Sequence, residues 1–269
     1  MFIKKILNKI IDKETSIKKN PFGNFPLASK EYYLAIFEKA SSKIFYEIDQ
    51  FEKKQSFNID KNWIDNLALH TQIVKKKSEI NYQHGRVLYA LLSTYSKDFK
   101  NKNENIIIFE TGTARGFSSI CMSKAINDAK VNGTIITLDV LPHNEKIYWN
   151  CIDDLEGKKS RAELLNKWPD ELKNIIFIQG QNRSTLKNLG INRINFAFLD
   201  AQHTKKDVLN EFYFVKDRQI KNDIIVFDDV DNTNPEVLEV VNSQQVKKFY
   251  NLKILNIEPG RAYAIAYKK

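Results

Sequence analysis

Short apolar segments alternate with amphipathic segments over the second half of the chain. Five apolar runs have the length of buried strands, and each is followed by a segment with helical spacing of its apolar residues. The expected strands are Ile106–Phe109, Thr134–Leu138, Ile175–Ile178, Ile194–Leu199 and Ile224–Phe227. The expected helices are Phe117–Ala129, a stretch through Leu165, a short helix near Thr185, Lys205–Lys216 and Pro235–Gln244. This alternation predicts a parallel sheet covered by helices on both faces.

The last part of the chain has a different pattern. Leu252–Ile257 and Ala262–Tyr267 are separated by Pro259-Gly260, which predicts a β-hairpin. The expected fold class is therefore α/β, with a doubly wound, mostly parallel seven-stranded sheet and a terminal antiparallel hairpin.

The first 78 residues have helical periodicity. Phe2, Ile3 and the isoleucines and leucine up to Ile11 form an apolar stripe opposite lysines, which predicts an amphipathic helix. A break at residues 20–26 precedes a second helical region, from Ser29 to about Leu69. We therefore expect an N-terminal helical arm or cap over residues 1–78 and an α/β domain over residues 79–269. The first helix either packs on the protein or on another subunit of a homo-oligomer, or lies on an anionic membrane.

Composition narrows the function classes. The 269 residues are 42% hydrophobic and carry a net charge of +9, but lysine dominates the basic residues and no arginine cluster with interleaved aromatics occurs. We therefore expect no nucleic-acid partner. Cys121 and Cys151 lie far apart without a metal-binding spacing, which indicates a reducing compartment, and we expect a cytoplasmic protein. No apolar segment has the length of a transmembrane helix.

A glycine turn follows the first expected strand. The sequence Glu110-x-Gly112-x-x-x-Gly116 places two glycines where a turn between strand and helix allows a ligand to touch the main chain. The pattern lacks the second and third glycines of a dinucleotide-binding fingerprint. It resembles the first motif of the class I S-adenosylmethionine-dependent methyltransferases. That resemblance implies that the turn, with Gly112, Thr113, Gly116 and Ser118, holds the methionine end of S-adenosylmethionine, and that Glu110 serves its ammonium group.

Two further positions concern the adenosine end of a cofactor. Asp139 ends the second expected strand, where an acid can accept hydrogen bonds from both ribose hydroxyls. The methyltransferase resemblance extends to this acid, which stands at their second motif. The same resemblance implies that Gln181, after the third strand, lies beside the adenine.

Three acids follow the fourth and fifth expected strands. Because adjacent parallel strands end at one edge of a sheet, Asp200, Asp228 and Asp229 should converge, and a hard cation such as Mg²⁺ would relieve their repulsion. With His203, the pattern resembles metal-dependent O-methyltransferases that modify sugars and macrolides, and cephalosporin-hydroxylase-like proteins. The resemblance implies that the three acids bind Mg²⁺, that Asp200 also borders the cofactor, and that His203 is the general base.

The expected function is methyl transfer from S-adenosylmethionine to a hydroxyl of a small molecule, with a divalent metal. The family resemblance favours a sugar or glycoside as the acceptor. Two alternatives stay open: an oxidoreductase that uses a nicotinamide cofactor on the same scaffold, and a nucleotide-binding module without catalytic activity. The acceptor, the oligomeric state and the role of residues 1–78 do not follow from the sequence.

Overall fold

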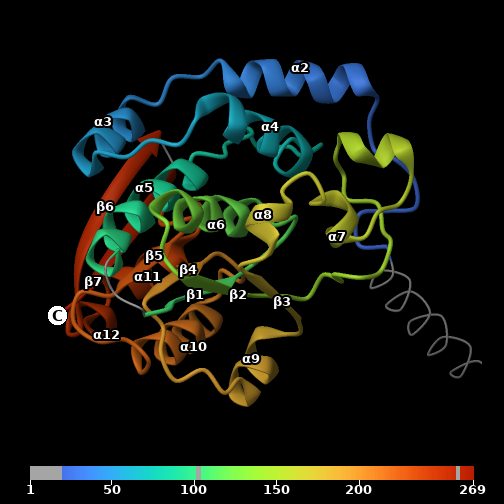
Figure 1. The fold of residues 1–269 in the computed structure, drawn as a ribbon. Helices are drawn as coiled ribbons and strands as arrows, with labels where there is room; N and C mark the ends of the chain where they lie inside the picture. Colours follow the sequence, from blue (N-terminus) through green and yellow to red (C-terminus); the bar gives the residue numbers. More distant parts are fainter. Residues whose placement is uncertain (1–19, 101–103, 259–260) are drawn as a thin grey trace, which may run out of the picture.

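The computed structural model describes residues 20–100, 104–258 and 261–269 (Figure 1). The amphipathic helix expected near the start of the chain lies outside the described residues. The helices are α2 Lys30–Ser41, α3 Tyr46–Gln55, α4 Lys61–Thr71, α5 His84–Ser96, α6 Phe117–Ala129, α7 Arg161–Leu164, α8 Pro169–Leu172, α9 Asn182–Thr185, α10 Lys205–Lys216, α11 Pro235–Asn242 and α12 Gln244–Lys247. Short 3₁₀ helices are η1 Lys97–Phe99, η2 Ile152–Glu156 and η3 Leu186–Asn188. The strands are β1 Ile106–Thr111, β2 Gly133–Asp139, β3 Ile175–Gln179, β4 Phe196–Leu199, β5 Ile224–Phe227, β6 Tyr250–Glu258 and β7 Arg261–Lys268.

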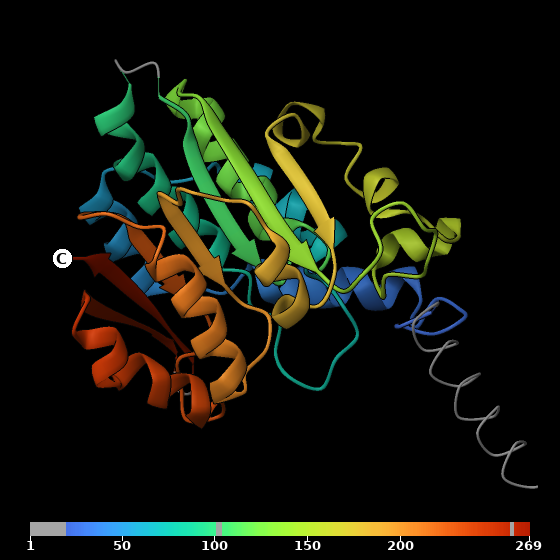
Figure 2. The ribbon, with the colours of Figure 1, turned by 90° about the horizontal axis from the view of Figure 1, so that it is seen from below.

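The seven strands form one mixed sheet in the order β3-β2-β1-β4-β5-β7-β6. Strands β1 to β5 pair in parallel, whereas β7 runs antiparallel to both β5 and β6. Figure 2 shows the parallel strands pointing toward a common edge. The α/β fold class and the terminal antiparallel hairpin expected from the sequence are confirmed.

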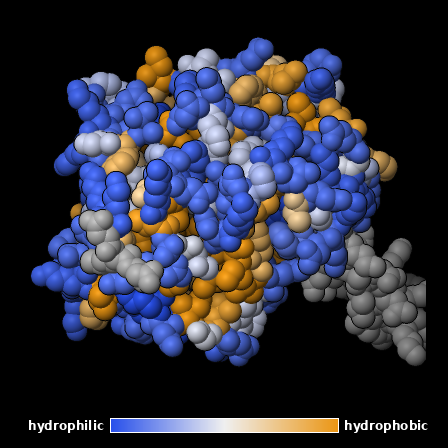
Figure 3. Space-filling model, in the orientation of Figure 1, coloured by the Kyte–Doolittle hydropathy of each residue, from blue (hydrophilic) through white to orange (hydrophobic). Residues whose placement is uncertain are grey.

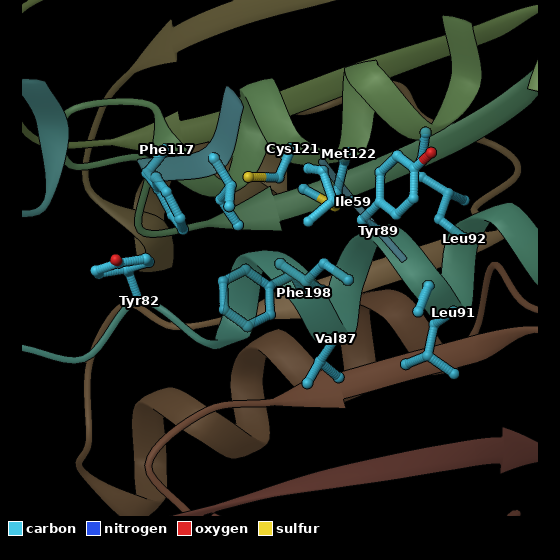
Figure 4. Packing of buried hydrophobic residues seen from close by; sticks show 14 of the residues in the cluster. Ile59, Tyr82, Val87, Tyr89, Leu91, Leu92, Phe117, Cys121, Met122 and Phe198 are labelled. Atoms are coloured by element: carbon cyan, nitrogen blue, oxygen red, sulfur yellow. The ribbon is translucent and has the colours of Figure 1, made fainter. Parts of the chain in front are cut away.

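Helices cover both faces of the sheet (Figure 1). Alternate residues of each strand face opposite sides, so Phe196 and Phe198 join the cluster under α5 and α6, while Ala197 and Leu199 join the one under α10 and α11. Figure 4 shows Phe198 of β4 among side chains of α5 and α6, including Val87 and Cys121. Because both faces are buried, the central strands read as continuous apolar runs in the sequence.

The helices α2, α3 and α4 confirm the helical pattern expected between Ser29 and about Leu69. Tyr33, Phe51 and Leu67 from these helices belong to the same apolar cluster as Phe198 of the sheet. The N-terminal helices therefore extend the layer formed by α5 and α6. The division of the chain at residue 78 stays a prediction.

The segment after β2 differs from the expectation. Most of residues 140–160 is loop, with the 3₁₀ helix η2 and a bridge between Ile147 and Lys159, in place of a helical stretch through Leu165. Ile147 and Trp149 are fully buried in a small cluster of their own, with Phe22 packed against it. The apolar residues that suggested a helix thus anchor an irregular loop.

The surface in Figure 3 is mostly hydrophilic, with hydrophobic residues gathered in the lower half of the view. Among the residues that the structure describes, no helix combines the length and the apolar character needed to cross a bilayer.

Candidate active site

The site residues expected from the sequence lie at the carboxyl ends of strands β1 to β5. A cavity of about 530 Å³ opens at this edge, bounded by Gly112 after β1, Asp139 at the end of β2, Gln181 after β3 and Asp200 after β4. This volume lies within the range of small-molecule sites in proteins. The carboxyl edge of an open α/β sheet is also where such folds bind ligands.

The glycine turn between β1 and α6 needs its glycines for packing. Gly112 and Gly116 have φ values of 90° and 91°. A Cβ atom on Gly112 would lie 2.0 Å from the main-chain oxygen of Asp200, and one on Gly116 would lie 2.6 Å from Cδ1 of Leu165. The glycine turn therefore packs directly against the end of β4, next to Asp200.

Glu110 lies under this turn and is fully buried. Its carboxylate accepts hydrogen bonds from the hydroxyls of Ser118, Ser119 and Thr137, while burial raises its pKa. Thr113 Oγ1 lies 2.5 Å from Thr137 Oγ1 in the same network. In this structure Glu110, Thr113 and Ser118 belong to a hydrogen-bond network that stabilises the turn. Their contact with a cofactor stays a prediction.

Asp139 anchors the opposite side of the cavity. Its Oδ2 accepts a hydrogen bond of 2.6 Å from the amide of Ala114, which lies within the turn, and its Oδ1 accepts one of 2.7 Å from the amide of Leu141. Each carboxylate oxygen keeps a lone pair that a ribose hydroxyl can use. Asp139 thus links the glycine turn to the end of β2 at the expected ribose position.

Arg161 supports the same turn, although no sequence motif marks it as a site residue. It is 1% exposed, donates a hydrogen bond of 2.9 Å from Nε to the carbonyl of Ala114, and places an Nη atom 4.0 Å from Asp139. Burial lowers its pKa to about 10, while Asp139 and then Glu110 act in the opposite direction. No sequence motif marks this position, because Arg161 reaches the turn only through the fold.

Arg115 is the basic residue inside the glycine turn. Its Nε donates a hydrogen bond of 2.5 Å to the carbonyl of Trp149, and its guanidinium lies 4.8 Å from the ring centre of Phe22. Burial lowers the pKa of Arg115. As the one charged residue between the two glycines, it could have been singled out from the sequence.

The second half of the site gathers two of the expected acids and the expected base. Among the described residues, ligand atoms of Asp200, His203 and Asp229 all lie within 4.8 Å of one another. Asp229 has a left-handed backbone with φ of 53°, and its amide donates a hydrogen bond of 2.7 Å to Oδ1 of Asp228. Asp228 is buried at 4% exposure. Asp228 is not part of the group formed by the other three side chains, and its role as a metal ligand stays a prediction.

The carboxylates of this cluster oppose one another's ionisation. Burial, followed by Asp228 and Asp229, raises the pKa of Asp200 well above its usual value, and burial followed by Asp229 raises that of Asp228. Arg261, the first residue of β7, counteracts both shifts. Carboxylate oxygens with one imidazole nitrogen suit a hard or borderline divalent cation such as Mg²⁺ or Mn²⁺. The donor set therefore fits the metal that the sequence pattern implied.

Comparisons with known proteins agree with this geometry. Residues 109–230, a little under half of the chain, match the family described as a methyltransferase domain. A search among curated proteins finds no match.

Solved structures share the fold at low sequence identity. A putative O-methyltransferase from Klebsiella pneumoniae is 15% identical with a TM-score of 0.53, over 77% of this chain and 89% of that one. An O-methyltransferase from Bacillus cereus in complex with SAH is 13% identical with a TM-score of 0.52, over 85% and 93%. The O-methyltransferase TomG from Streptomyces achromogenes in complex with SAM is 16% identical with a TM-score of 0.53, over 79% and 92%. The chain therefore has the Rossmann-like methyltransferase fold, and its residues 109–230 match the methyltransferase domain family.

Proposed function

We propose that this protein is an S-adenosylmethionine-dependent O-methyltransferase that acts on a hydroxyl of a small molecule, with a sugar or glycoside as the favoured acceptor. The observation that carries the proposal is the contact between Gly112 and the main chain of Asp200. It joins a cofactor-sized cavity to a cluster that combines carboxylates with a histidine. A methyl donor on one side of Asp200 would face a hydroxyl activated on the other side.

The cofactor would occupy the cavity along the carboxyl edge. Asp139 would accept hydrogen bonds from the ribose hydroxyls. The main-chain groups of the glycine turn would contact the methionine end of the cofactor. Val140 is 56% exposed and lines the same cavity, so it offers an apolar surface to the adenine next to Gln181. The solved SAM and SAH complexes of proteins with this fold support this assignment.

Bound S-adenosylmethionine supplies a methyl group on a sulfonium, which is transferred by in-line displacement. The acceptor oxygen forms a bond to the methyl carbon while the sulfur–carbon bond breaks, so the products are a methyl ether and S-adenosylhomocysteine. His203 would accept the proton that the hydroxyl loses, since an imidazole can do so near neutral pH. The cavity and the cluster would align the two reactants, which is a large part of catalysis for such a displacement.

Asp200 and Asp229 would hold a divalent cation, with Asp228 next to them. When bound, the cation would lower the pKa of an acceptor hydroxyl and fix its oxygen. The donor atom of His203 also lies within the candidate cluster, so this side chain could act as a ligand in place of a base.

Calorimetric titration tests the cofactor assignment before any acceptor is known. We expect S-adenosylhomocysteine to bind with a dissociation constant on the order of micromolar, about −8 kcal/mol, and NAD to show no saturable binding. Tight binding of NAD without binding of S-adenosylhomocysteine would establish the oxidoreductase alternative. Binding of S-adenosylhomocysteine with no methyl transfer to any acceptor would favour a binding module.

A metal titration tests the cluster. We expect Mg²⁺ to raise the melting temperature of the wild type, because a ligand that binds the folded state stabilises it. The shift should disappear in Asp200→Asn and persist in Asp170→Asn, whose carboxylate is exposed and pairs with Lys173. An equal shift in both variants would remove the metal from the proposal.

A further inference from the structure

An exposed apolar patch lies at the start of α2 and in the segment before it. The side chain of Phe25 is 75% exposed, and those of Leu27 and Tyr32 are each 39% exposed. Lys75 joins the patch, because its Nζ donates a hydrogen bond of 3.1 Å to the carbonyl of Leu27 and lies 5.9 Å from the ring centre of Tyr32. Exposed apolar side chains that gather within a polar rim mark interaction surfaces.

Three consecutive lysines lie beside this patch, at residues 75–77 in the loop between α4 and α5, and all three are exposed. A cavity of about 180 Å³ separates the loop from α2. Its lining includes Lys77 from the loop with Ile36 and Lys39 from the helix. Ile36 and Lys39 follow Tyr32 by one and two turns on the same face of α2. The apolar patch and the loop lysines therefore form one continuous surface.

The acidic residues nearby leave this surface positively charged. Glu79, the acid of the loop, pairs with Lys39 and with Lys43. Glu31 and Glu38 lie seven residues apart, so they share a stripe of α2 that differs from the one facing the loop. The surface thus combines exposed apolar side chains with an excess of lysine.

The same loop borders the candidate active site. Figure 2 shows it extending past the carboxyl ends of the strands. Lys76 lies within electrostatic range of Arg261 and of Asp229. The side chain of Asn150 fixes the loop, because it accepts a hydrogen bond from the amide of Lys75 and donates one to its carbonyl, each at 3.0 Å. A partner bound to this surface would therefore lie next to the acidic cluster.

The sequence before residue 20, which lies outside the described residues, has the same combination of residue types. Residues 1–19 contain six lysines against two acids, and their apolar residues recur at helical spacing from Phe2 to Ile11. Basic amphipathic sequences of this kind bind the surface of anionic membranes. The described chain begins at Asn20, five residues before Phe25, so this sequence directly precedes the apolar patch.

We propose that the surface formed by Phe25, Leu27, Tyr32 and the lysines at residues 75–77 docks on an anionic lipid membrane, with residues 2–11 as a second contact. The apolar side chains would enter the interfacial region, and the lysines would lie against the anionic headgroups. A second copy of the chain fits this surface less well, because a two-fold contact would place the lysines against the same lysines of the other copy. Docking would hold the acidic cluster at the membrane surface.

Flotation of the whole chain with lipid vesicles tests the proposal. One set of vesicles contains phosphatidylcholine alone, and the other contains phosphatidylcholine mixed with phosphatidylglycerol. We expect the protein to float with the mixed vesicles and to stay behind with the neutral ones. Binding to the mixed vesicles should weaken as NaCl is added, because salt screens exposed charges.

Single substitutions locate the contact. Phe25→Ser should weaken binding to the mixed vesicles by at least about tenfold, because an aromatic ring no longer leaves water. Lys77→Gln should weaken it about fivefold, which corresponds to about 1 kcal/mol for one lysine near an anionic surface. Ile220→Ser and Lys221→Gln are the matched controls and should bind as the wild type. Ile220 is 63% exposed and comes before β5, at the opposite edge of the sheet.

Ile6→Asp, in the apolar stripe of the sequence before residue 20, should also weaken vesicle binding. Loss of binding in Ile6→Asp with none in Phe25→Ser or Lys77→Gln would overturn the docking surface described above. Equal binding of the wild type to neutral and mixed vesicles would overturn the part assigned to the lysines.

Sedimentation of the protein without lipid tests the other occupant. A dimer that is lost in Phe25→Ser, together with no binding to vesicles, would make a second copy of the chain the partner and overturn the membrane. Vesicle binding needs neither cofactor nor acceptor, so its absence would leave the proposed methyltransferase function standing. Failure of S-adenosylhomocysteine to bind would reject that function and leave the docking surface unaffected.

Discussion

Nε2 of His203 lies 3.2 Å from Oδ2 of Asp229, although the two residues follow different strands of the sheet. His203 comes after β4 and Asp229 after β5, and these strands pair in parallel. The side chain assigned as base thus lies within reach of a carboxylate assigned as metal ligand. Substitutions on either side of this contact distinguish the two roles.

We expect His203→Ala to lower kcat by roughly 10²- to 10⁴-fold, the usual range for a positioned proton acceptor, and to leave the Mg²⁺ activation constant nearly unchanged. Asp229→Asn should instead weaken the binding of Mg²⁺, because it removes a negative charge from the proposed cation site. Asp217→Asn, at an exposed carboxylate beside Lys216, is the control. A loss of Mg²⁺ affinity in His203→Ala as large as in Asp229→Asn would make the histidine a ligand.

Glu211 of α10 should make the folding stability depend on pH. It is 1% exposed and accepts hydrogen bonds from Thr111 at 2.8 Å and from Asn182. Burial raises its pKa from 4.5 to about 7. The folded state therefore binds this proton more tightly than the unfolded state, so stability from this group is fully present below pH 4.5 and is lost as pH rises toward 7.

Glu211→Gln should therefore raise the melting temperature at pH 8 and leave it nearly unchanged at pH 4.5. The gain in the free energy of unfolding at pH 8 is at most on the order of 3 kcal/mol, from the size of the pKa shift. Glu239→Gln, an exposed residue paired with Lys205, should show no such pH dependence. A melting temperature lowered at pH 8 by Glu211→Gln would contradict the assigned direction.

Arg161→Met should weaken cofactor binding although Arg161 does not line the cofactor cavity. It removes the hydrogen bond to the carbonyl of Ala114 and leaves Asp139 without its nearest cation. We expect a loss of roughly 3 kcal/mol in the free energy of unfolding, as for other broken buried pairs, and an SAH dissociation constant raised at least about tenfold. Thermal unfolding and calorimetry measure the two effects. Lys173→Met should change neither, since Lys173 pairs with Asp170 at the surface.

Gly112→Ala should reduce folding stability together with cofactor binding. The added methyl group would meet the carbonyl of Asp200, and the φ of 90° is unfavourable for any residue with a side chain. Strain of this kind costs about 1–3 kcal/mol or more. Gly190→Ala is the matched control, because a Cβ atom there meets nothing within 4 Å. A Gly112→Ala protein as stable as the control would mean that β4 can move away from the turn.

The sequence predicted most of the sheet, because its strands are buried on both faces and read as apolar runs. The same runs located Asp139, Asp200 and Asp228, since each acid directly follows a strand that the pattern identifies. The hydrogen-bond partners of Glu110 were harder to predict from the sequence. Its position was predicted, but its hydrogen bonds to two serines of α6 depend on how the helix begins.

Residues that enter the site from elsewhere in the chain could not be found from the sequence. Arg161 follows an irregular loop, and Arg261 begins the last strand. Each reaches the site through a tertiary contact, and neither belongs to a local pattern with a recognisable spacing. The prediction of a helix over residues 140–160 was wrong for a related reason, because the buried Trp149 packs on the distant Phe22 and not along a helix.

Strand β7 lies between β5 and β6, although it is the last of the seven to appear along the chain. During synthesis, β6 leaves the ribosome before β7, the strand that joins it to the sheet. The apolar residues and the backbone N–H and C=O groups of β6 therefore stay unpaired until residues 261–268 have been made. Folding of this half of the sheet should therefore finish late, after long-range pairing with β5. Chains arrested before residue 261 would expose an unpaired β5 edge and be prone to aggregation. A cell that makes this protein would then depend on complete translation for solubility as well as for activity.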